Sequence, residues 1–130
     1  MRILQPENWV RPRGYANGIE AEGKMIFVAG QIGWNENGEF KEHALAGQFR
    51  QALQNVLTVL REATAGPEHI ARMTLFVTSR EEYVAARPEL GAAWKELMGR
   101  NFPAMAVVVV TGFVELEAKV EIEATAVVPR

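Results

Sequence analysis

The apolar residues between about positions 44 and 63 recur at steps of three and four, and this period limits the fold more than any other feature of the chain. Such spacing places them on one face of an α-helix. The face consists of Leu45, Phe49, Ala52, Leu53, Val56, Leu57 and Leu60. The opposite face is predicted to hold most of the polar residues of this segment, which are Gln48, Arg50, Gln51, Gln54 and Arg61. A helix of this kind requires an apolar surface to pack on.

Short apolar runs on both sides of the helix have the length of strands. They cover residues 24–30, 70–78, 104–111 and 118–127, and another short strand is expected to begin near Ala16. The last run alternates, with Val120 and Ile122 on one face and Glu121 and Glu123 on the other, which is typical of a half-buried strand. Residues 35–38 (NENG) predict a turn, with a small hairpin around it.

A second helix is predicted after Ser79. Its hydroxyl would cap the first turn, and Glu82 would return the bond in a capping box. Pro88 is unfavourable inside a helix, so either the helix bends there or its regular part begins near Arg87. The inward side chains are expected to be Tyr83, Ala86, Leu90, Trp94 and Leu97.

The order of these elements predicts an α+β fold in which two helices pack on one face of a mixed sheet. A length of 130 residues with 48% hydrophobic residues suits a single domain over residues 1–130. Residues 1–15, rich in Pro and Arg, form an N-terminal arm in this interpretation. The apolar run 105–110 is expected to lie in the core or at a subunit contact.

The charge balance argues against nucleic acid or an anionic membrane as the main partner. The net charge is −2 and the pI is about 5.7, whereas both partners favour a concentrated positive field. The absence of cysteine excludes thiol nucleophiles and cysteine metal sites. Neither a secretory leader nor a membrane span is recognisable, so a soluble, cytoplasmic protein is expected.

Few residues offer catalytic chemistry. His43 and His69 have no partners at metal-ligand spacing and are assigned ordinary surface roles, and Ser79 is the only serine. Glu121 and Glu123 share one strand face with side chains about 7 Å apart. If this face lines a cleft, one carboxylate can hold a water as a general acid or base. The alternative is a strand face that simply meets solvent.

Five motifs occur in an order and spacing that resemble the RidA/YjgF family, the Rid imine deaminases also labelled L-PSP endoribonucleases. They are Gly14-Tyr15, FVAGQI (27–32), RQALQNVL (50–57), FPAM (102–105) and VEIEA (120–124). The resemblance implies a chorismate-mutase-like subunit in a homotrimer, with a small-molecule substrate in clefts between subunits. It also implies hydrolysis of reactive enamines or imines to 2-oxo acids and ammonia, without metal or cofactor.

The resemblance carries over residue by residue. It implies that Glu121 positions the water, that Tyr15 shapes the pocket, and that the backbone at Gly30 and Gln31 holds substrate, although Ala29 replaces the usual serine. Met105 stands where the family has a carboxylate-binding arginine. Arg87, in place of a cleft asparagine, is a substrate-binding candidate that can supply a cation from another direction.

The sequence therefore leaves two main functions open. One is a Rid-type hydrolytic deaminase whose specificity is altered by Met105. The other is a non-catalytic trimer that binds a small metabolite in its intersubunit cleft. The endoribonuclease activity in the family's label is a third possibility, against which the acidic pI and the lack of a plausible histidine pair argue.

Overall fold

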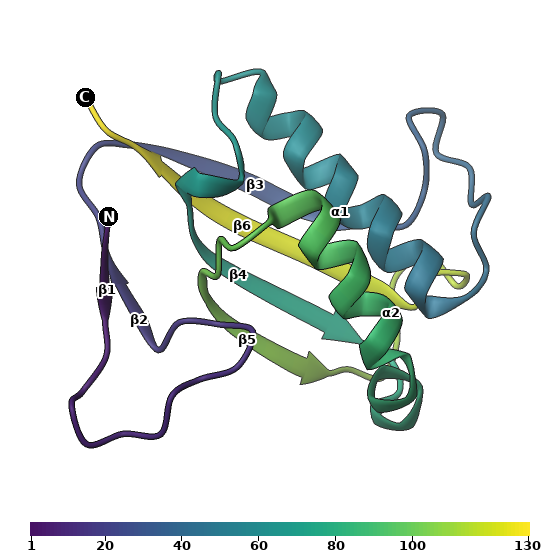
Figure 1. Cartoon of the computed structure of the whole chain (residues 1–130). Coiled ribbons are helices and arrows are strands. Elements are labelled where there is room, and N and C mark those ends of the chain that lie inside the picture. The colour runs from purple at the N-terminus through teal and green to yellow at the C-terminus, as the bar shows by residue number, and fades with distance from the viewer.

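A four-stranded mixed sheet carries both long helices on one of its faces (Figure 1). The computed structural model describes residues 1–130. The sheet order is β3-β6-β4-β5, with β4 and β5 parallel and the other neighbours antiparallel. The sheet strands are β3 (Lys24–Ile32), β4 (Ile70–Val77), β5 (Ala104–Val109) and β6 (Val120–Val128). The helices are α1 (Leu45–Arg61), the 3-10 turn η1 (Pro67–His69) and α2 (Arg80–Met98). The predicted α+β architecture is confirmed.

The N-terminal arm is more regular than predicted. β1 (Arg2–Leu4) pairs with β2 (Gly18–Glu20) to form a separate antiparallel ribbon, which lies beside the β5 end of the main sheet in Figure 1. The ribbon joins that sheet through an isolated bridge between Ala16 and Ala104. β2 begins at Gly18, two residues after the start expected near Ala16.

The core lies between the sheet and the helices. The apolar face predicted for α1 is buried, and it packs against the alternate residues Val120, Ile122, Ala124 and Ala126 of β6. Met73, Leu75 and Val77 of β4 belong to the same cluster. Because these positions fill one face of each strand, the intervening residues point to the face that no helix covers.

Gln48 is the clearest correction to the predicted helix. It was assigned to the polar face, yet only 1% of it is exposed. Its side-chain amide donates to the carbonyls of Glu42 (3.2 Å) and Glu117 (2.9 Å), and its oxygen accepts from the backbone N–H of Lys119 (2.7 Å). These bonds satisfy the buried amide and fasten the start of α1 to the chain just before β6.

Helix α2 begins as predicted, with the Ser79 hydroxyl accepting a hydrogen bond from the backbone N–H of Glu82 (3.1 Å). The reciprocal half of the capping box is wrong, because the Glu82 carboxylate instead pairs with the Lys119 ammonium at 2.6 Å. The helix passes through Pro88 without a break, so a start near Arg87 is also wrong. In Figure 1 the first turns lie at an angle to the rest of the helix, as expected for an internal proline.

The predicted turn at residues 35–38 is present, but no strands flank it. The Asn35 side chain accepts from the backbone N–H groups of Asn37 and Glu39, and Gly38 adopts a positive φ of 73°. Trp34 and Phe40 pack against each other instead of pairing as strands, with ring centroids 5.9 Å apart. Local side-chain bonds have replaced the ladder that a hairpin would need.

Candidate functional site

A β-bulge in β3 brings the backbone of Gly30 against Glu121. Val28 pairs with Ala124, and Gln31 pairs with Ile122. Between these two pairs β3 contains two residues and β6 contains one, which defines the bulge. A Cβ atom placed on Gly30 would lie 2.7 Å from the Glu121 carboxyl carbon. Only glycine permits this approach of carboxylate and main chain.

The Glu121 carboxylate is half-buried and has no hydrogen-bond or ion-pair partner within the chain. Its strand neighbours Val120 and Ile122 are fully buried under the helices, so Glu121 projects from the opposite face of the sheet. A carboxylate without a partner is available to bind a water or a polar ligand.

The backbone of Gln31 lies near Glu121, but its side chain points to the other face of the sheet. Its backbone follows the bulge beside Glu121, whereas its position opposite Ile122 directs the side chain to the helix-covered face. There its amide donates to the carbonyl of Ala29 at 3.1 Å. The backbone of the bulge therefore lies beside Glu121, whereas the Gln31 side-chain amide does not.

The other predicted site residues lie on β5, on α2 and in the segment before β2. Met105 lies opposite Met73 in the parallel register and packs against the core beneath the helices. Arg87 of α2 is exposed, with its guanidinium carbon 5.9 Å from the centroid of the Tyr83 ring. Tyr15 is exposed and precedes Ala16, whose N–H donates to the carbonyl of Pro103 at 2.9 Å.

Glu121 and Met105 do not meet within one chain. Along β4, Met105 is level with Met73 and Glu121 is level with Phe76, a separation of about 10 Å along the strands. β5 and β6 are two strand spacings apart, about 10 Å across the sheet. The side chains also lie on opposite faces. A pocket that includes both groups therefore needs more than one copy of the chain.

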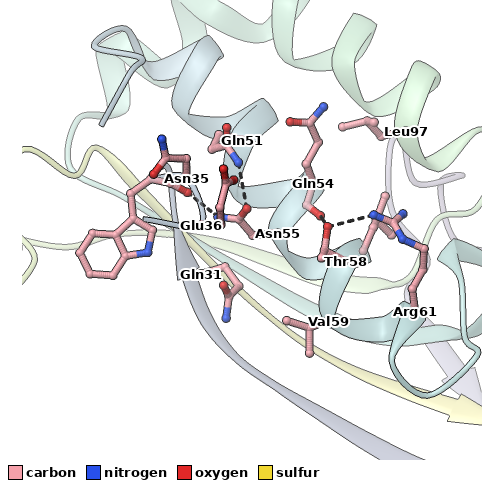
Figure 2. Close-up of a pocket in the computed structure, with 12 residues that line it drawn as sticks. Gln31, Asn35, Glu36, Gln51, Gln54, Asn55, Thr58, Val59, Arg61 and Leu97 are labelled. Atoms are coloured by element: carbon pink, nitrogen blue, oxygen red, sulfur yellow. Dashed lines mark hydrogen bonds between the residues drawn. The ribbon is translucent and has the colours of Figure 1, made fainter. Parts of the chain in front are cut away.

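A polar groove of about 590 Å³ runs over α1 and includes Gln31 but none of the other predicted residues (Figure 2). Its side chains are largely engaged with the protein itself. Asn55 donates to the carbonyls of Ile32 (3.1 Å) and Trp34 (2.8 Å), and Gln51 donates to Asn55 (2.9 Å). These hydrogen bonds anchor the segment after β3 to α1. We assign the groove no part in catalysis.

The remaining polar residues have structural roles or none that the contacts define. The Nδ1 atom of His69 accepts from the backbone N–H of Gly66 at 3.0 Å, which closes η1. No three histidine, aspartate or glutamate side chains cluster at metal-binding distance. Neither helix combines the length and apolar character needed to cross a bilayer. Gln48, for which the sequence predicted no role at the site, fixes residues 117–119 shortly before Glu121.

Comparison with known proteins places this fold and these motifs in one family. The family model described as Endoribonuclease L-PSP matches residues 10–128, nearly the whole chain. The chain therefore belongs to the L-PSP endoribonuclease family, which is the RidA/YjgF family that the five motifs resemble.

Individual relatives agree with this assignment. The 2-iminobutanoate/2-iminopropanoate deaminase of Escherichia coli is 31% identical over 113 residues, 87% of this chain and 86% of the relative. A RutC family protein of Pasteurella multocida is 33% identical over 81% of each chain. The crystal structure of YyfB, a Rid family protein of unknown function from Yersinia pestis, matches with a TM-score of 0.84 and 32% identity over 98% of each chain.

Proposed function

We propose that this protein is a hydrolytic deaminase of a reactive enamine or imine metabolite, with a substrate preference set by Met105. The observation that carries the proposal is the unpaired Glu121 carboxylate next to the Gly30 backbone. A deaminase needs a base that positions water, and Glu121 is suited to this because no other group of the chain occupies it. The activity named for the Escherichia coli relative supports the reaction class.

The proposed reaction begins with a water hydrogen-bonded to Glu121. The carboxylate accepts a proton while the water oxygen bonds to the imine carbon, and the C=N double bond becomes a single bond to an amine. Glu121 returns this proton to the nitrogen, which gives a carbinolamine with one hydroxyl and one amino group on the same carbon. The carboxylate then takes the hydroxyl proton and passes it to the amino nitrogen, the C–N bond breaks, and the carbon–oxygen double bond forms as ammonia leaves. One water is consumed, and one carbonyl compound and one ammonia are released, so the chain's carboxylate is regenerated.

Met105 defines the preferred substrate in this proposal. A thioether offers no charge to a carboxylate and presents an apolar wall to it. A charge-assisted hydrogen bond contributes about 1.5–3 kcal/mol, so its loss lowers affinity for a 2-imino acid by roughly tenfold to a hundredfold. We therefore infer a less acidic or more apolar imine as substrate, unless Arg87 supplies the cation from α2.

The proposed active form is a homotrimer with its pockets between subunits. This arrangement is supported by the separation of Glu121 from Met105, because the two halves of a pocket lie on opposite faces of one chain. In a ring of copies, the Gly30 and Glu121 side of one chain can meet the α2 and β5 side of the next. The substrate then lies between Glu121 of one subunit and Met105 and Arg87 of its neighbour.

The test is an ammonia-release assay on imines generated in place by an amino-acid oxidase, with acidic, aliphatic and aromatic side chains. We expect turnover of at least one apolar imine, and a loss of about 10²–10⁴-fold in kcat for Glu121→Gln. Glu62→Gln, at the exposed end of α1, is the matched control and should keep full activity.

Absence of turnover across the whole panel, from protein shown to be folded and trimeric, would contradict the deaminase proposal. That outcome, together with binding of a small metabolite by calorimetry, would favour the non-catalytic binding protein. Equal turnover in wild type and Glu121→Gln would also exclude the proposed role of the carboxylate.

A further inference from the structure

Two of the six asparagines of the chain are followed directly by glycine, and the fold places these two pairs in different surroundings. Asn37-Gly38 lies in the turn between β3 and α1, whereas Asn17-Gly18 lies at the start of β2. Glycine has no Cβ to keep its backbone nitrogen away from the asparagine side chain before it. In such a pair the glycine nitrogen can attack the side-chain amide, provided that the chain is free to move.

The turn around Asn37 is exposed and is closed only by local hydrogen bonds. The backbone N–H of Gly38 donates to the carbonyl of Asn35 at 2.9 Å, and the Asn35 side chain accepts from the backbone N–H of Asn37, also at 2.9 Å. The side-chain amide of Asn37 makes no hydrogen bond. A Cβ built on Gly38 would meet only the Cε3 atom of Trp34, at 3.9 Å. Exposed segments with few contacts open at little cost in free energy, so the Gly38 nitrogen can reach the amide before it.

The surroundings of Asn17 are tighter. Its side-chain amide donates to a glutamine side chain at 2.8 Å. The residue before it, Ala16, is buried and donates its N–H to the carbonyl of Pro103 at 2.9 Å. The residue after it, Gly18, pairs with Leu4 in the antiparallel ribbon, and a Cβ built on it would lie 3.2 Å from the Leu4 Cβ. The rotation that brings the Gly18 nitrogen to the Asn17 amide would therefore break contacts on both sides.

We propose that Asn37 is a modification site at which the chain converts its own asparagine to isoaspartate and aspartate, without an enzyme. The backbone nitrogen of Gly38 bonds to the Cγ atom of Asn37 and gives up its proton. The bond from Cγ to the amide nitrogen breaks, and that nitrogen takes up the proton and leaves as ammonia. Water then adds to either carbonyl carbon of the cyclic succinimide and the ring C–N bond breaks, so each event consumes one water and releases one ammonia. This inference does not depend on the deaminase reaction.

Either product adds a carboxylate where the turn is already acidic. Glu36 and Glu39 flank the site, and the cation paired there is Lys41, whose Nζ atom lies 3.3 Å from the Glu39 carboxylate. Isoaspartate also lengthens the main chain by one carbon atom, which shifts the backbone N–H that donates to Asn35. Modification should therefore loosen the turn between β3 and α1, and it adds one negative charge to the formal net charge of −2.

The test incubates the folded protein at mildly alkaline pH, which favours loss of the Gly38 proton, and follows each asparagine by peptide mass spectrometry. Labelling with an isoaspartyl methyltransferase distinguishes isoaspartate from aspartate. Conversion at Asn37 should be faster than at Asn17 by about tenfold or more, and isoaspartate should be among its products. Conversion at Asn37 that is no faster than at Asn17 would overturn the proposal. So would aspartate as the sole product, because opening of the ring gives both.

Replacing each asparagine by glutamine gives a matched pair of variants. Asn37→Gln keeps an amide but would need a larger ring, so the acidic species that anion exchange separates should almost disappear. Asn17→Gln is the control and should form them like wild type. An Asn37→Gln protein that forms acidic species at the wild-type rate would place the reaction elsewhere and contradict the proposal. Circular dichroism before incubation shows whether both variants are folded.

Unfolding the protein separates the effect of the fold from that of the sequence. In denaturant, Asn17 and Asn37 should convert at similar rates, because neither pair is then held by its surroundings. A preference for Asn37 that is as large in denaturant as in the folded protein would overturn the structural argument. Ammonia from Asn37 amounts to at most one molecule per chain, so continued turnover of an added imine tests the deaminase separately.

Discussion

At the scale of single residues, the missing side chain of Gly30 matters as much as the carboxylate it faces. Alanine at this position would place its Cβ 2.7 Å from the Glu121 carboxyl carbon, so the glutamate must move. Displacement of a catalytic group by about 1 Å can cost about a hundredfold in rate. We expect Gly30→Ala to lower kcat by tenfold to a hundredfold, measured by ammonia release, with a normal circular dichroism spectrum.

Gly91→Ala is the matched control for this substitution. Its added Cβ would meet nothing within 4 Å, and alanine favours the helix. A Gly30→Ala protein with wild-type kcat would show that the position of Glu121 is unimportant.

Met105 gives a second prediction at this scale. Met105→Arg should raise kcat/KM for 2-imino acids by roughly tenfold to a hundredfold, because the guanidinium can grip the carboxylate. An imine without a carboxylate is the control substrate and should gain nothing. If both substrates respond alike, or if neither does, Met105 does not face the substrate carboxylate.

At the scale of elements, Gln48 connects the first helix to the central strand. Replacing it with methionine keeps the approximate volume but removes its hydrogen bonds to Glu42, Glu117 and Lys119. Unsatisfied backbone groups there should cost about 2–4 kcal/mol, which lowers the melting temperature by roughly 10 °C. Thermal unfolding followed by circular dichroism measures this shift.

Gln54→Met on the same helix is the control, because the Gln54 side chain makes no hydrogen bond in the structure. Its melting temperature should change little. Equal shifts in both variants would mean that the Gln48 amide contributes nothing specific.

The sequence predicted the elements well because hydrophobic period and length define them locally. The alternation in β6 and the apolar stripe of α1 both appear as expected. The burial of Gln48 was also within reach, since it lies three residues after Leu45 and four before Ala52, on the apolar stripe. Its polarity favoured the wrong face, because two of its three partners, Glu117 and Lys119, are some 70 residues away and only the fold brings them close.

The candidate site was less predictable for a similar reason. The motifs identified Glu121 and Met105, but the faces on which they lie depend on strand order and register. The bulge beside Gly30 has no signature that period alone reveals. The unexpected partner of Glu82 is likewise a contact between distant segments, the N-terminus of α2 and the chain before β6.

At the scale of the whole molecule, a pocket shared between chains predicts complementation. Glu121→Gln disables one half of each proposed pocket, and Met105→Trp should block the other half by filling it. In equal mixtures that exchange subunits freely, about a quarter of the pockets should combine two intact halves. Ammonia release should therefore recover to about that fraction of wild type, although each variant alone is nearly inactive.

The control is a mixture of the same proteins before subunits have exchanged, which should remain inactive. If activity never recovers in assemblies shown to be mixed, the two halves of the pocket come from the same chain.

The position of β6 has a consequence for how the protein is made. This strand is the last in the chain, yet it lies between β3 and β4 in the sheet. Until β6 has been made, β3 has no neighbouring strand to pair with. The apolar face of α1 then lacks the part of the sheet that β6 supplies. The sheet can close only after residues 120–128 have been made and have left the ribosome. Loss of residues 120–128 would therefore remove a strand from the middle of the sheet, and not a dispensable edge.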